Sequence, residues 1–320
     1  MVKIILVGGA GYIGGFMTDY ISSQNEYQIT VYDSLLFENQ YLKEVDFIYG
    51  DIRDYKKLEA VLPEFDIIVW LAALVGDGAC AIDPKTTLQV NYEPVKWLVD
   101  NFKNKFIVFM STCSVYGQNP NLIDEDATPN PLSVYATTKL SSERYIVEHA
   151  KDYLIFRLGT LYGIGDQHSR LRFDLVVNYL TLRAMNKEKL TVFGGQQWRP
   201  ILHVRDVSTA LVYSIKNGIR GLFNLSEKNV VIQELAQEIA AKIPGTLVEY
   251  AEIKFEDHRD YKVKNDKFFS TGWKPHYSLS DGINELISIL KEGRITDPYQ
   301  DLYHNTKYLK NIDFSEIKKW

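Results

Sequence analysis

The sequence contains few of the residues that build disulfide frameworks and metal sites. Only two of its 320 residues are cysteine, Cys80 and Cys113, and they stand in no spaced pattern. The six histidines are scattered, without HxxxH or HExxH spacing. These absences argue against a disulfide scaffold and against a thiolate zinc site, and we expect no metal ion in the protein.

The chain also lacks a basic tract and a long hydrophobic run. Its formal net charge is −5, which argues against general nucleic-acid binding, although a few local arginines can still bind a small anion. The N-terminal residues are apolar, but glycines interrupt them and Asp19 ends the stretch. We therefore expect neither a signal peptide nor a membrane span, and a reducing cytoplasm is the expected location.

Short apolar runs alternate with helical patterns in the first half of the chain. Hydrophobic residues make up 46% of the sequence and charged residues 24%, as in ordinary globular proteins. The predicted strands span residues 3–7, 27–33, 46–51, 66–75, 105–112 and 153–159. Helices are predicted at 55–62, 84–101 and 133–149. This alternation predicts an α/β fold, a Rossmann-type doubly wound parallel sheet with helices on both faces.

The second half has a looser rhythm, which indicates a smaller mixed α/β lobe. A short strand at 190–194 and helices at 232–243 and 281–293 belong to it. Segments 200–204 and 221–226 look like late strands that return to the main sheet. We therefore divide the chain into a first domain of residues 1–165 with returning segments at about 201–232, a lobe of residues 166–200 and 233–295, and a polar, aromatic tail at 296–320.

The segment "GGAGYIG" follows the first strand and opens a helix. Gly8 allows a tight turn, Gly11 lets the backbone approach a pyrophosphate, and Gly14 allows close helix packing. Asp33 ends the second strand, where a carboxylate can bind ribose hydroxyls and repel a 2′-phosphate. This pattern predicts NAD rather than NADP as cofactor. The alternative is a structural turn with a solvated Asp33.

Two further features lie near the ends of strands. Asp51, after the third strand, can accept a hydrogen bond from the adenine amine or can cap the helix that follows. Tyr135 and Lys139 have the i, i+4 spacing that places both on one face of a helix. By itself this pair is either an exposed surface pair or an acid–base device.

Eight motifs together resemble one family. "GGAGYIG", "YDSL", "GDIRD", "LAALV", "STCSVYG", "YATTK", "FRLGTLYG" and "GGQQWRPILHVRDV" occur in the order found in the extended short-chain dehydrogenase/reductases. The chain resembles the nucleotide-sugar epimerase/dehydratase branch, typified by UDP-glucose 4-epimerase, over nearly its whole length. The resemblance implies a nucleotide-sugar substrate.

The resemblance also implies roles for individual residues. Tyr135 would be the general base or acid, Thr112 the hydroxyl that orients the substrate oxygen, and Lys139 the group that holds the nicotinamide ribose. A phenol has a pKa of about 10, and a nearby ammonium and the positive nicotinamide ring would both favour the phenolate. Ser111 and Ser114 are possible helpers, and the alternative for these two serines is turn formation at a strand end.

Further binding residues follow from the same resemblance. The cofactor contacts expected beyond the glycines are Tyr12, Ile13, Asp33, Asp51, Ile52, Leu71, Ala72, Ala73 and Lys139. The substrate contacts expected are Ser111, Thr112, Tyr135, Arg172, Val192, Arg199 and Arg259. The arginines would bind the diphosphate, with Arg199 ranked above Arg259 and Arg172, and each could instead be an ordinary surface arginine. Val192 belongs to the strand along which the nucleotide base would lie.

Departures from the family pattern narrow the chemistry. Where 4,6-dehydratases carry Asp-Glu after the threonine, this chain has Cys113 and Ser114, which argues against elimination of water. Thr160 replaces a common asparagine and puts one phosphate contact in doubt. His203 is expected to be a core histidine, and Asp206 to cap the next helix. His168 lies in a loop near the expected substrate cleft and could touch the sugar.

The leading hypothesis is oxidation of a sugar C4 hydroxyl with NAD, as a net 4-dehydrogenase or a 4-epimerase in the synthesis of surface-glycan precursors. A 4-keto-sugar reductase is the alternative, and a dinucleotide-sensing protein without turnover is a remote one. We expect a homodimer formed by the helices near 84–101 and 133–149. Four apolar positions could serve that contact or the protomer core: Val95, Leu98, Val99 and Ile146.

Overall fold

The computed structural model describes residues 1–312 except 39, 167, 169 and 252–258. Its main sheet has seven strands, all parallel. Their order in space is β11 (Gly221–Leu225), β7 (Asp152–Leu158), β5 (Phe106–Thr112), β4 (Ile67–Trp70), β1 (Val2–Val7), β2 (Tyr27–Asp33) and β3 (Asp46–Tyr49). The predicted Rossmann-type sheet is confirmed.

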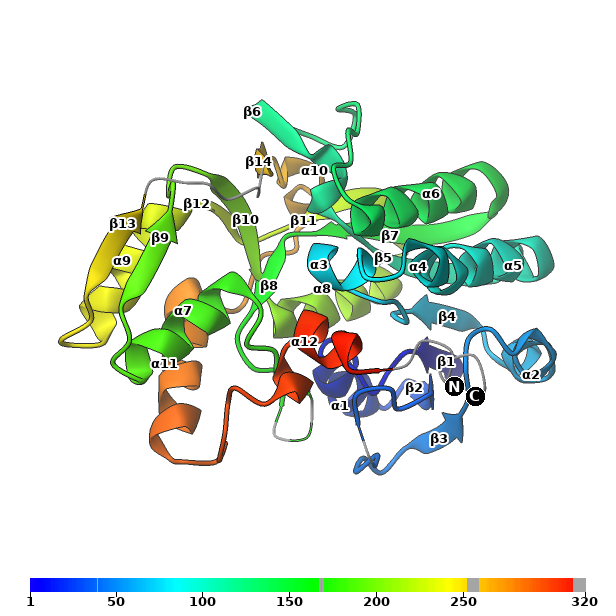
Figure 1. Cartoon of the computed structure of the whole chain (residues 1–320). Helices are drawn as coiled ribbons and strands as arrows, with labels where there is room; N and C mark the ends of the chain where they lie inside the picture. Colours follow the sequence, from blue (N-terminus) through cyan, green and yellow to red (C-terminus); the bar gives the residue numbers. More distant parts are fainter. Residues whose placement is uncertain (39, 167, 169, 252–258, 313–320) are drawn as a thin grey trace.

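Helices cover both faces of this sheet (Figure 1), because alternate strand residues point to opposite sides. On one face Ile4 and Leu6 of β1 pack in a core with residues of α1 (Gly14–Ser22) and α8 (Val204–Lys216). On the other face Ile5 and Val7 pack in a core with residues of α2, α5 and α6. The bounds of these three helices are Tyr55–Val61, Glu93–Phe102 and Val134–His149.

The four apolar positions left open between core and dimer contact belong to the core. Val95, Leu98, Val99 and Ile146 are all fully buried inside the protomer. They pack against the sheet, so they are not available to a second copy. A dimer contact on α5 or α6 would have to use other side chains.

The second lobe combines small sheets with helices. β10 (Trp198–His203) pairs with β8 (Thr160–Tyr162) and β12 (Lys228–Val231). The prediction that segment 200–204 returns to the main sheet is therefore wrong. Among the described residues of the second half, only β11 joins the main sheet. The other pairs are β9 (Leu190–Phe193) with β13 (Val248–Ala251), and β6 (Gln118–Ile123) with β14 (Asp260–Val263).

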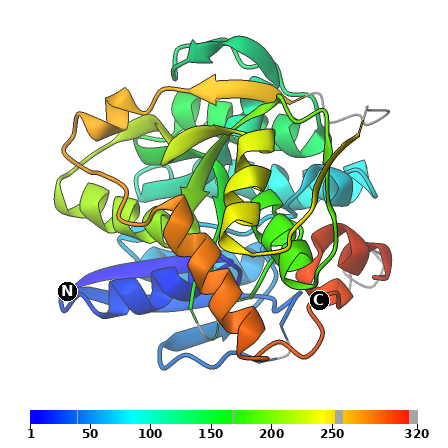
Figure 2. The ribbon, with the colours of Figure 1, turned by 90° about the vertical axis from the view of Figure 1, so that its left-hand side faces the viewer.

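The helices of this lobe are α7 (Val176–Met185), α9 (Ile232–Lys242) and α11 (Leu279–Lys291), and Figure 2 shows α9 and α11 on the side turned toward the viewer. Their apolar faces share a core that contains Leu180, Leu235 and Ile283. The remaining short helices are α3 (Asp77–Cys80), α4 (Pro84–Asn91), α10 (Asp266–Phe269) and α12 (Asn305–Lys310). Three single 3₁₀ turns lie at Leu62–Glu64, Cys113–Tyr116 and Asp301–Tyr303. Among the described residues, no helix is both long enough and apolar enough to cross a membrane.

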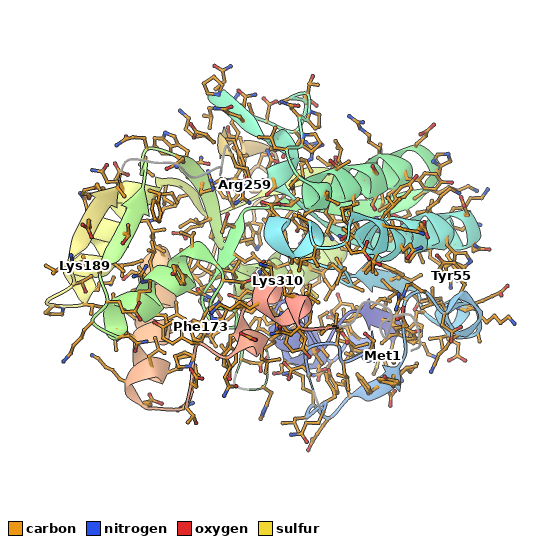
Figure 3. All side chains as sticks on the ribbon, viewed as in Figure 1. Met1, Tyr55, Phe173, Lys189, Arg259 and Lys310 are labelled. Carbon is orange, nitrogen blue, oxygen red and sulfur yellow. The ribbon has the colours of Figure 1, made fainter. Side chains whose placement is uncertain are left out.

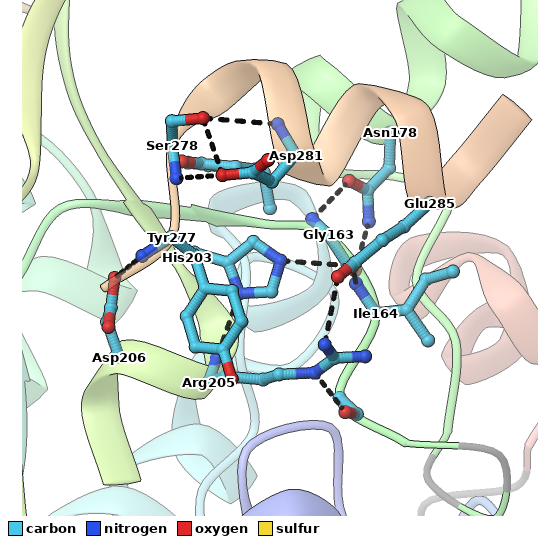
Figure 4. Close-up of polar contacts among 12 residues, drawn as sticks. Gly163, Ile164, Asn178, His203, Arg205, Asp206, Tyr277, Ser278, Asp281 and Glu285 are labelled. Atoms are coloured by element: carbon cyan, nitrogen blue, oxygen red, sulfur yellow. Dashed lines mark hydrogen bonds and ion pairs between the residues drawn. The ribbon is translucent and has the colours of Figure 1, made fainter. Parts of the chain in front are cut away.

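A polar network fastens α11 to the rest of the molecule (Figure 4). His203 is fully buried, as predicted for a core histidine, and its Nε2 lies 3.1 Å from Glu285 Oε2. Arg205 Nη1 donates to the other oxygen of Glu285 at 2.9 Å. Asp206 does not cap α8, because the cap is His203, whose side chain accepts from Arg205 N. Asp206 instead accepts from the backbone N–H of His276 at 2.9 Å.

Candidate active site

A cavity of about 720 Å³ opens where the strands of the main sheet reach their carboxyl ends. This edge is where doubly wound sheets bind ligands, and the volume is that of an ordinary small-molecule site. The loops after β1, β2, β3, β4, β5 and β7 all contribute to its wall. Segments far apart in the sequence therefore meet at one place.

The structure brings nearly all predicted site residues to this wall. They are Gly8, Gly11, Tyr12, Ile13, Gly14, Asp33, Asp51, Ile52, Leu71, Ala72, Ala73, Ser111, Thr112, Tyr135, Lys139, Arg172 and Arg259. Two predicted residues, Val192 and Arg199, do not line it. Val192 is buried in the core of the second lobe, so its side chain faces away from the cavity.

The glycine turn fits the close approach of a pyrophosphate. Gly8 has a φ of +87°, and a Cβ there would lie 2.4 Å from Ala72 N. A Cβ on Gly14 would lie 2.2 Å from Gly9 O, so the start of α1 packs directly on the turn. A Cβ on Gly11 would meet only Gly8 O, at 3.6 Å. Gly11 therefore leaves space on the cavity side, where the first N–H groups of α1 can bind an anion.

Two carboxyl groups stand at the end of β2, where an adenosine ribose would lie. Asp33 Oδ2 accepts from Ala10 N at 3.0 Å and Oδ1 from Leu35 N at 2.7 Å, and burial raises the Asp33 pKa. Burial also raises the pKa of Glu38 to about 7. Carboxylates at this position accept hydrogen bonds from ribose hydroxyls and repel a 2′-phosphate. The residues of the cavity thus fit NAD.

Asp51 does not cap the helix that follows it. The cap of α2 is Asp54, whose side chain accepts from Lys57 N. Asp51 pairs instead with Arg53, with Nη2 and Oδ2 2.5 Å apart. Of the two alternatives for Asp51, the helix cap is therefore wrong, and contact with the adenine stays a prediction.

The cap of α6 sets the position of the tyrosine. Ser133 Oγ accepts from Ala136 N at 3.2 Å, so the helix begins at Val134 and Tyr135 lies in its first turn. Tyr135 and Lys139 then face the same cavity, one turn apart. They are not an exposed surface pair, since Lys139 is only 3% exposed.

The surroundings of Tyr135 keep its phenol protonated. Burial raises the pKa of Tyr135, and nearby Cys80 and Asp77 act in the same direction. Arg172 and a hydrogen bond with the Thr112 side chain lower the pKa, without reversing the effect of burial. The protein alone therefore holds a neutral phenol next to the Thr112 hydroxyl, and ionisation would need a further positive charge in the cavity.

Burial brings the pKa of Lys139 close to neutral pH. Its Nζ donates to Met110 O at 2.9 Å and lies 4.7 Å from the centre of the Phe109 ring. Burial lowers the pKa of Lys139 to about 8. The ammonium still has donors to offer, because it uses one of its three N–H groups for Met110.

Buried contacts fix the residues next to Thr112. Ser111 Oγ donates to Glu143 Oε2 at 2.9 Å, and Glu143 forms a buried ion pair with Arg157. Cys113 Sγ donates to Arg157 O at 3.1 Å, and burial raises the pKa of the Cys113 thiol. Ser114 Oγ lies 3.3 Å from the Tyr261 hydroxyl. A thiol held neutral and a serine are poor acid–base groups for eliminating water.

Arginines and acids alternate on the cavity wall. Arg172 Nε and Nη2 each donate to one oxygen of Asp174 at 3.0 Å. Arg259, which precedes β14 and is labelled in Figure 3, pairs with Asp77 at 2.8 Å. Arg199 Nη1 donates to Trp198 O at 2.8 Å and also to Arg259 O. Arg199 thus supports the segment carrying Arg259, and its own contact with a phosphate stays a prediction.

Sequence reasoning missed part of the wall. The additional lining residues include Leu35, Leu36, Phe37, Glu38, Asp77, Arg170, Asn305, Tyr308 and Ile312. Arg170 lies two positions before Arg172 in the same segment, and this spacing was its only signal. Among the histidines, His168 is exposed and does not line the cavity, while His258 lies outside the described residues.

Comparisons with known proteins agree with this geometry. The model of the NAD dependent epimerase/dehydratase family matches residues 4–226. A protein of Methanocaldococcus jannaschii, provisionally named a UDP-glucose 4-epimerase, is 25% identical over 92% of this chain and 100% of its own. A low-salt glycan biosynthesis protein of Haloferax volcanii is 25% identical over 89% of this chain and 97% of its own.

Solved structures share the fold. The UDP-glucose 4-epimerase of Thermotoga maritima with UDP-glucose has a TM-score of 0.81 at 22% identity, covering 92% of this chain and 100% of its own. The UDP-glucuronic acid 4-epimerase of Bacillus cereus with UDP-glucuronic acid and NAD has a TM-score of 0.79 at 24% identity, covering 91% and 99%.

The family match spans the glycine turn, the Asp33 carboxylate, Thr112 and the Tyr135–Lys139 pair, all of which the structure gathers around one cavity. The predicted cofactor, NAD, is confirmed as that of the family. The chain belongs to the NAD dependent epimerase/dehydratase family, a family of enzymes.

Proposed function

We propose that the protein oxidises the C4 hydroxyl of a nucleotide-activated sugar. One observation carries the proposal: Tyr135 and Thr112 line the same cavity as the glycine turn and Asp33. A sugar alcohol placed between the tyrosine and the cofactor site can give up its hydroxyl proton to the tyrosine and the hydride of its C4 carbon to the cofactor at once. The relatives named as UDP-sugar 4-epimerases support this substrate class.

The chain's own residues prepare the proton transfer. Thr112 orients the sugar oxygen, and Tyr135 accepts its proton as the hydroxyl becomes a ketone. Bound NAD supplies the hydride acceptor and a positive charge near the phenol. Lys139, with donors beyond its bond to Met110, holds the ribose beside Tyr135. The Lys139 ammonium and the cofactor charge together oppose the effect of burial on the Tyr135 pKa.

Arg172 and Arg259 are proposed to bind the diphosphate of the substrate. Both reach the cavity wall on the side of the second lobe, and each is paired with one carboxylate, Asp174 or Asp77. A guanidinium can keep one such partner and still offer N–H groups to phosphate oxygens. Arg199 stays a predicted diphosphate contact, and the strand with Val192 is proposed to lie along the nucleotide base.

The fate of the ketone separates the candidate reactions. A 4-epimerase returns the hydride to the other face of the sugar, whereas a 4-dehydrogenase releases the ketone. The names of the relatives favour the epimerase, and the glycan biosynthesis protein favours a role in surface-glycan precursors. A 4-keto-sugar reductase would run the same step backwards.

The test uses the purified enzyme with a panel of UDP-, GDP-, dTDP- and CDP-sugars. Formation of reduced nicotinamide, followed by absorbance, indicates net oxidation, and an inverted C4 without reduced nicotinamide, followed by NMR, indicates epimerisation. Tyr135→Phe should lower turnover by at least about a hundredfold, because general acid–base groups contribute about 10²–10⁴-fold. Wild-type turnover in Tyr135→Phe would refute the mechanism, and a protein that binds NAD without converting any sugar would be a dinucleotide sensor.

We also infer a homodimer built on α4, α5 and α6, which pack together on one side of the protomer. With the four apolar positions buried, the contact would use exposed residues such as Leu88 and Val147. Sedimentation equilibrium should give twice the protomer mass for the wild type, and Val147→Asp should shift it toward the monomer. A monomer at micromolar concentration in the wild type would contradict the dimer.

A further inference from the structure

The last described segment, residues 301–312, forms part of the cavity wall. Asn305, Tyr308 and Ile312 line the cavity together with the glycine turn and the loop after β2. Leu309 is fully buried and belongs to a small core with Leu74 and Cys80. The segment is therefore docked on the molecule, with α12 packed against α3 (Figure 1).

Asn305 ties α12 to two loops that contribute to the cavity wall. Its side-chain N–H donates to Val75 O at 2.7 Å, in the loop after β4. Its side-chain oxygen accepts from Arg170 Nη1 at 2.7 Å, and its backbone N–H donates to Asp174 Oδ2 at 3.0 Å. Asn305 is only 2% exposed, so these bonds are shielded from water. Removing its side chain would leave buried partners unsatisfied.

Tyr308 ties α12 to the loop after β2. Its hydroxyl donates to Leu36 O at 2.8 Å, and its ring centre lies 5.1 Å from that of Phe37. Arg170 lies over the Phe37 ring at 3.7 Å from its centre. Leu36 and Phe37 belong to the loop that follows Asp33, the carboxylate of the adenosine end. The helix thus bridges the loops after β2 and β4.

A dinucleotide in this fold lies along the carboxyl ends of these strands, between the same two loops. We propose that residues 301–312 are a cover over bound NAD, in which Asn305 and Tyr308 are cofactor-site residues. NAD enters or leaves only when α12 parts from α3 and from the loop after β2. The inference rests on the NAD dependence of the family and not on the sugar chemistry, so the two can fail independently.

A reversible cross-link tests the cover directly. A Cβ built on Gly78 in α3 lies 3.8 Å from Thr306 Cβ in α12, which is the separation of about 3.8 Å typical of a disulfide. Gly78→Cys with Thr306→Cys should therefore lock α12 onto α3, and the two native cysteines are buried. Each single-cysteine variant, treated with the same oxidant, is the control for effects of oxidation other than the cross-link.

The measurement is the rate at which NAD-loaded protein loses its cofactor into excess buffer, with mass spectrometry to verify the cross-link. Oxidation of the double variant should slow release by at least about tenfold, and reduction should restore the original rate. The oxidised, NAD-free double variant should also bind NAD more slowly. Equal release rates in the verified oxidised and reduced forms would overturn the proposal.

Point variants give a second, independent readout. Asn305→Ala should speed NAD release by about tenfold, because it cuts the links to Arg170 and Val75. Tyr308→Phe removes one hydroxyl and should speed release by a smaller factor. Lys307→Ala and Lys310→Ala, on the exposed side of α12, should not change it. If Asn305→Ala does not fold, Tyr308→Phe carries the test, and wild-type release in Tyr308→Phe would then overturn the proposal.

Discussion

Gly11 and Gly14 stand one turn apart, but an added methyl group meets different surroundings at the two positions. A Cβ on Gly14 would lie 2.2 Å from the backbone oxygen of Gly9, whereas a Cβ on Gly11 finds its nearest neighbour at 3.6 Å. The first is a packing position and the second faces the cavity. Alanine in place of Gly14 should therefore lower stability, whereas alanine in place of Gly11 should weaken cofactor binding.

Gly14→Ala should destabilise the fold by about 2 kcal/mol or more, because backbone must move to admit the methyl group. Gly11→Ala should change stability by less than about 0.5 kcal/mol and weaken NAD binding by at least about tenfold. Urea unfolding and calorimetric titration with NAD measure the two effects. The opposite pattern, a stable Gly14→Ala and an unchanged NAD affinity in Gly11→Ala, would contradict this view of the turn.

Lys139 makes stability depend on pH in a defined window. Burial lowers its pKa from 10.5 to about 8, so between these values the unfolded chain binds more protons than the folded one. The contribution of Lys139 to the free energy of unfolding therefore rises as pH increases from about 8 to 10.5, and it is lost as pH falls through 8. Lys139→Met removes this contribution.

The free energy of unfolding of the wild type, relative to that of Lys139→Met, should therefore increase between pH 7 and pH 10. The increase should be a few kcal/mol at most. Urea unfolding at several pH values measures it, with Lys96→Met, at an exposed position, as the control. A difference that stays constant over this range would mean that the lysine keeps its ordinary pKa.

At the scale of elements, a buried ion pair joins α6 to the sheet behind the proposed catalytic residues. Glu143 on α6 accepts from Arg157 Nε of β7 and from Ser111 Oγ of β5. Arg157 Nη1 also donates to the Tyr116 hydroxyl at 2.7 Å. These contacts fix α6, which carries Tyr135 and Lys139, against β5, which carries Thr112.

Glu143→Gln should destabilise the protein by about 3–5 kcal/mol, because it leaves a buried guanidinium without its carboxylate. Replacing both partners by methionine should recover much of that loss, since no charge then remains buried. Glu148→Gln, on the exposed end of the same helix, is the matched control. Denaturant unfolding of the four proteins measures these effects, and a Glu143→Gln variant as stable as the control would show that the pair is not structural.

At the scale of the whole molecule, the cavity draws on segments from Gly8 to Ile312. NAD should therefore stabilise the entire fold, by about 2.7 kcal/mol when its concentration is a hundred times the dissociation constant. Stripping the cofactor should lower Tm, and adding NAD should restore it. NADP should restore less, because Asp33 and Glu38 repel a 2′-phosphate. Thermal unfolding with each dinucleotide measures this, and an equal shift with NADP would contradict the role of these two acids.

The sequence predicted the parts of this molecule that depend on local patterns. The strands of the main sheet are apolar runs in the sequence. The glycine turn and the Tyr135–Lys139 pair could be placed from their spacing, because a strand end or a helix cap next to them sets their position. The α12 contacts, Arg170 and Asp77 were not predictable in this way, because long-range packing places them on the wall. Arg199 shows the converse: its motif predicted a place on the wall, but Arg199 does not line the cavity and donates instead to the carbonyls of Trp198 and Arg259.

The place of α12 in the chain has a consequence for how the protein is made. The sheet is complete once β11, Gly221–Leu225, has been synthesised, whereas Asn305–Lys310 follows near the end of the chain. During synthesis the N-terminal parts can fold first, so the cavity stays open until α12 has left the ribosome. A chain cut short by a premature stop or by a protease before Asn305 would keep its sheet and exchange its cofactor rapidly. Docking of α12 would thus be the step that turns a transient NAD binder into a holoenzyme.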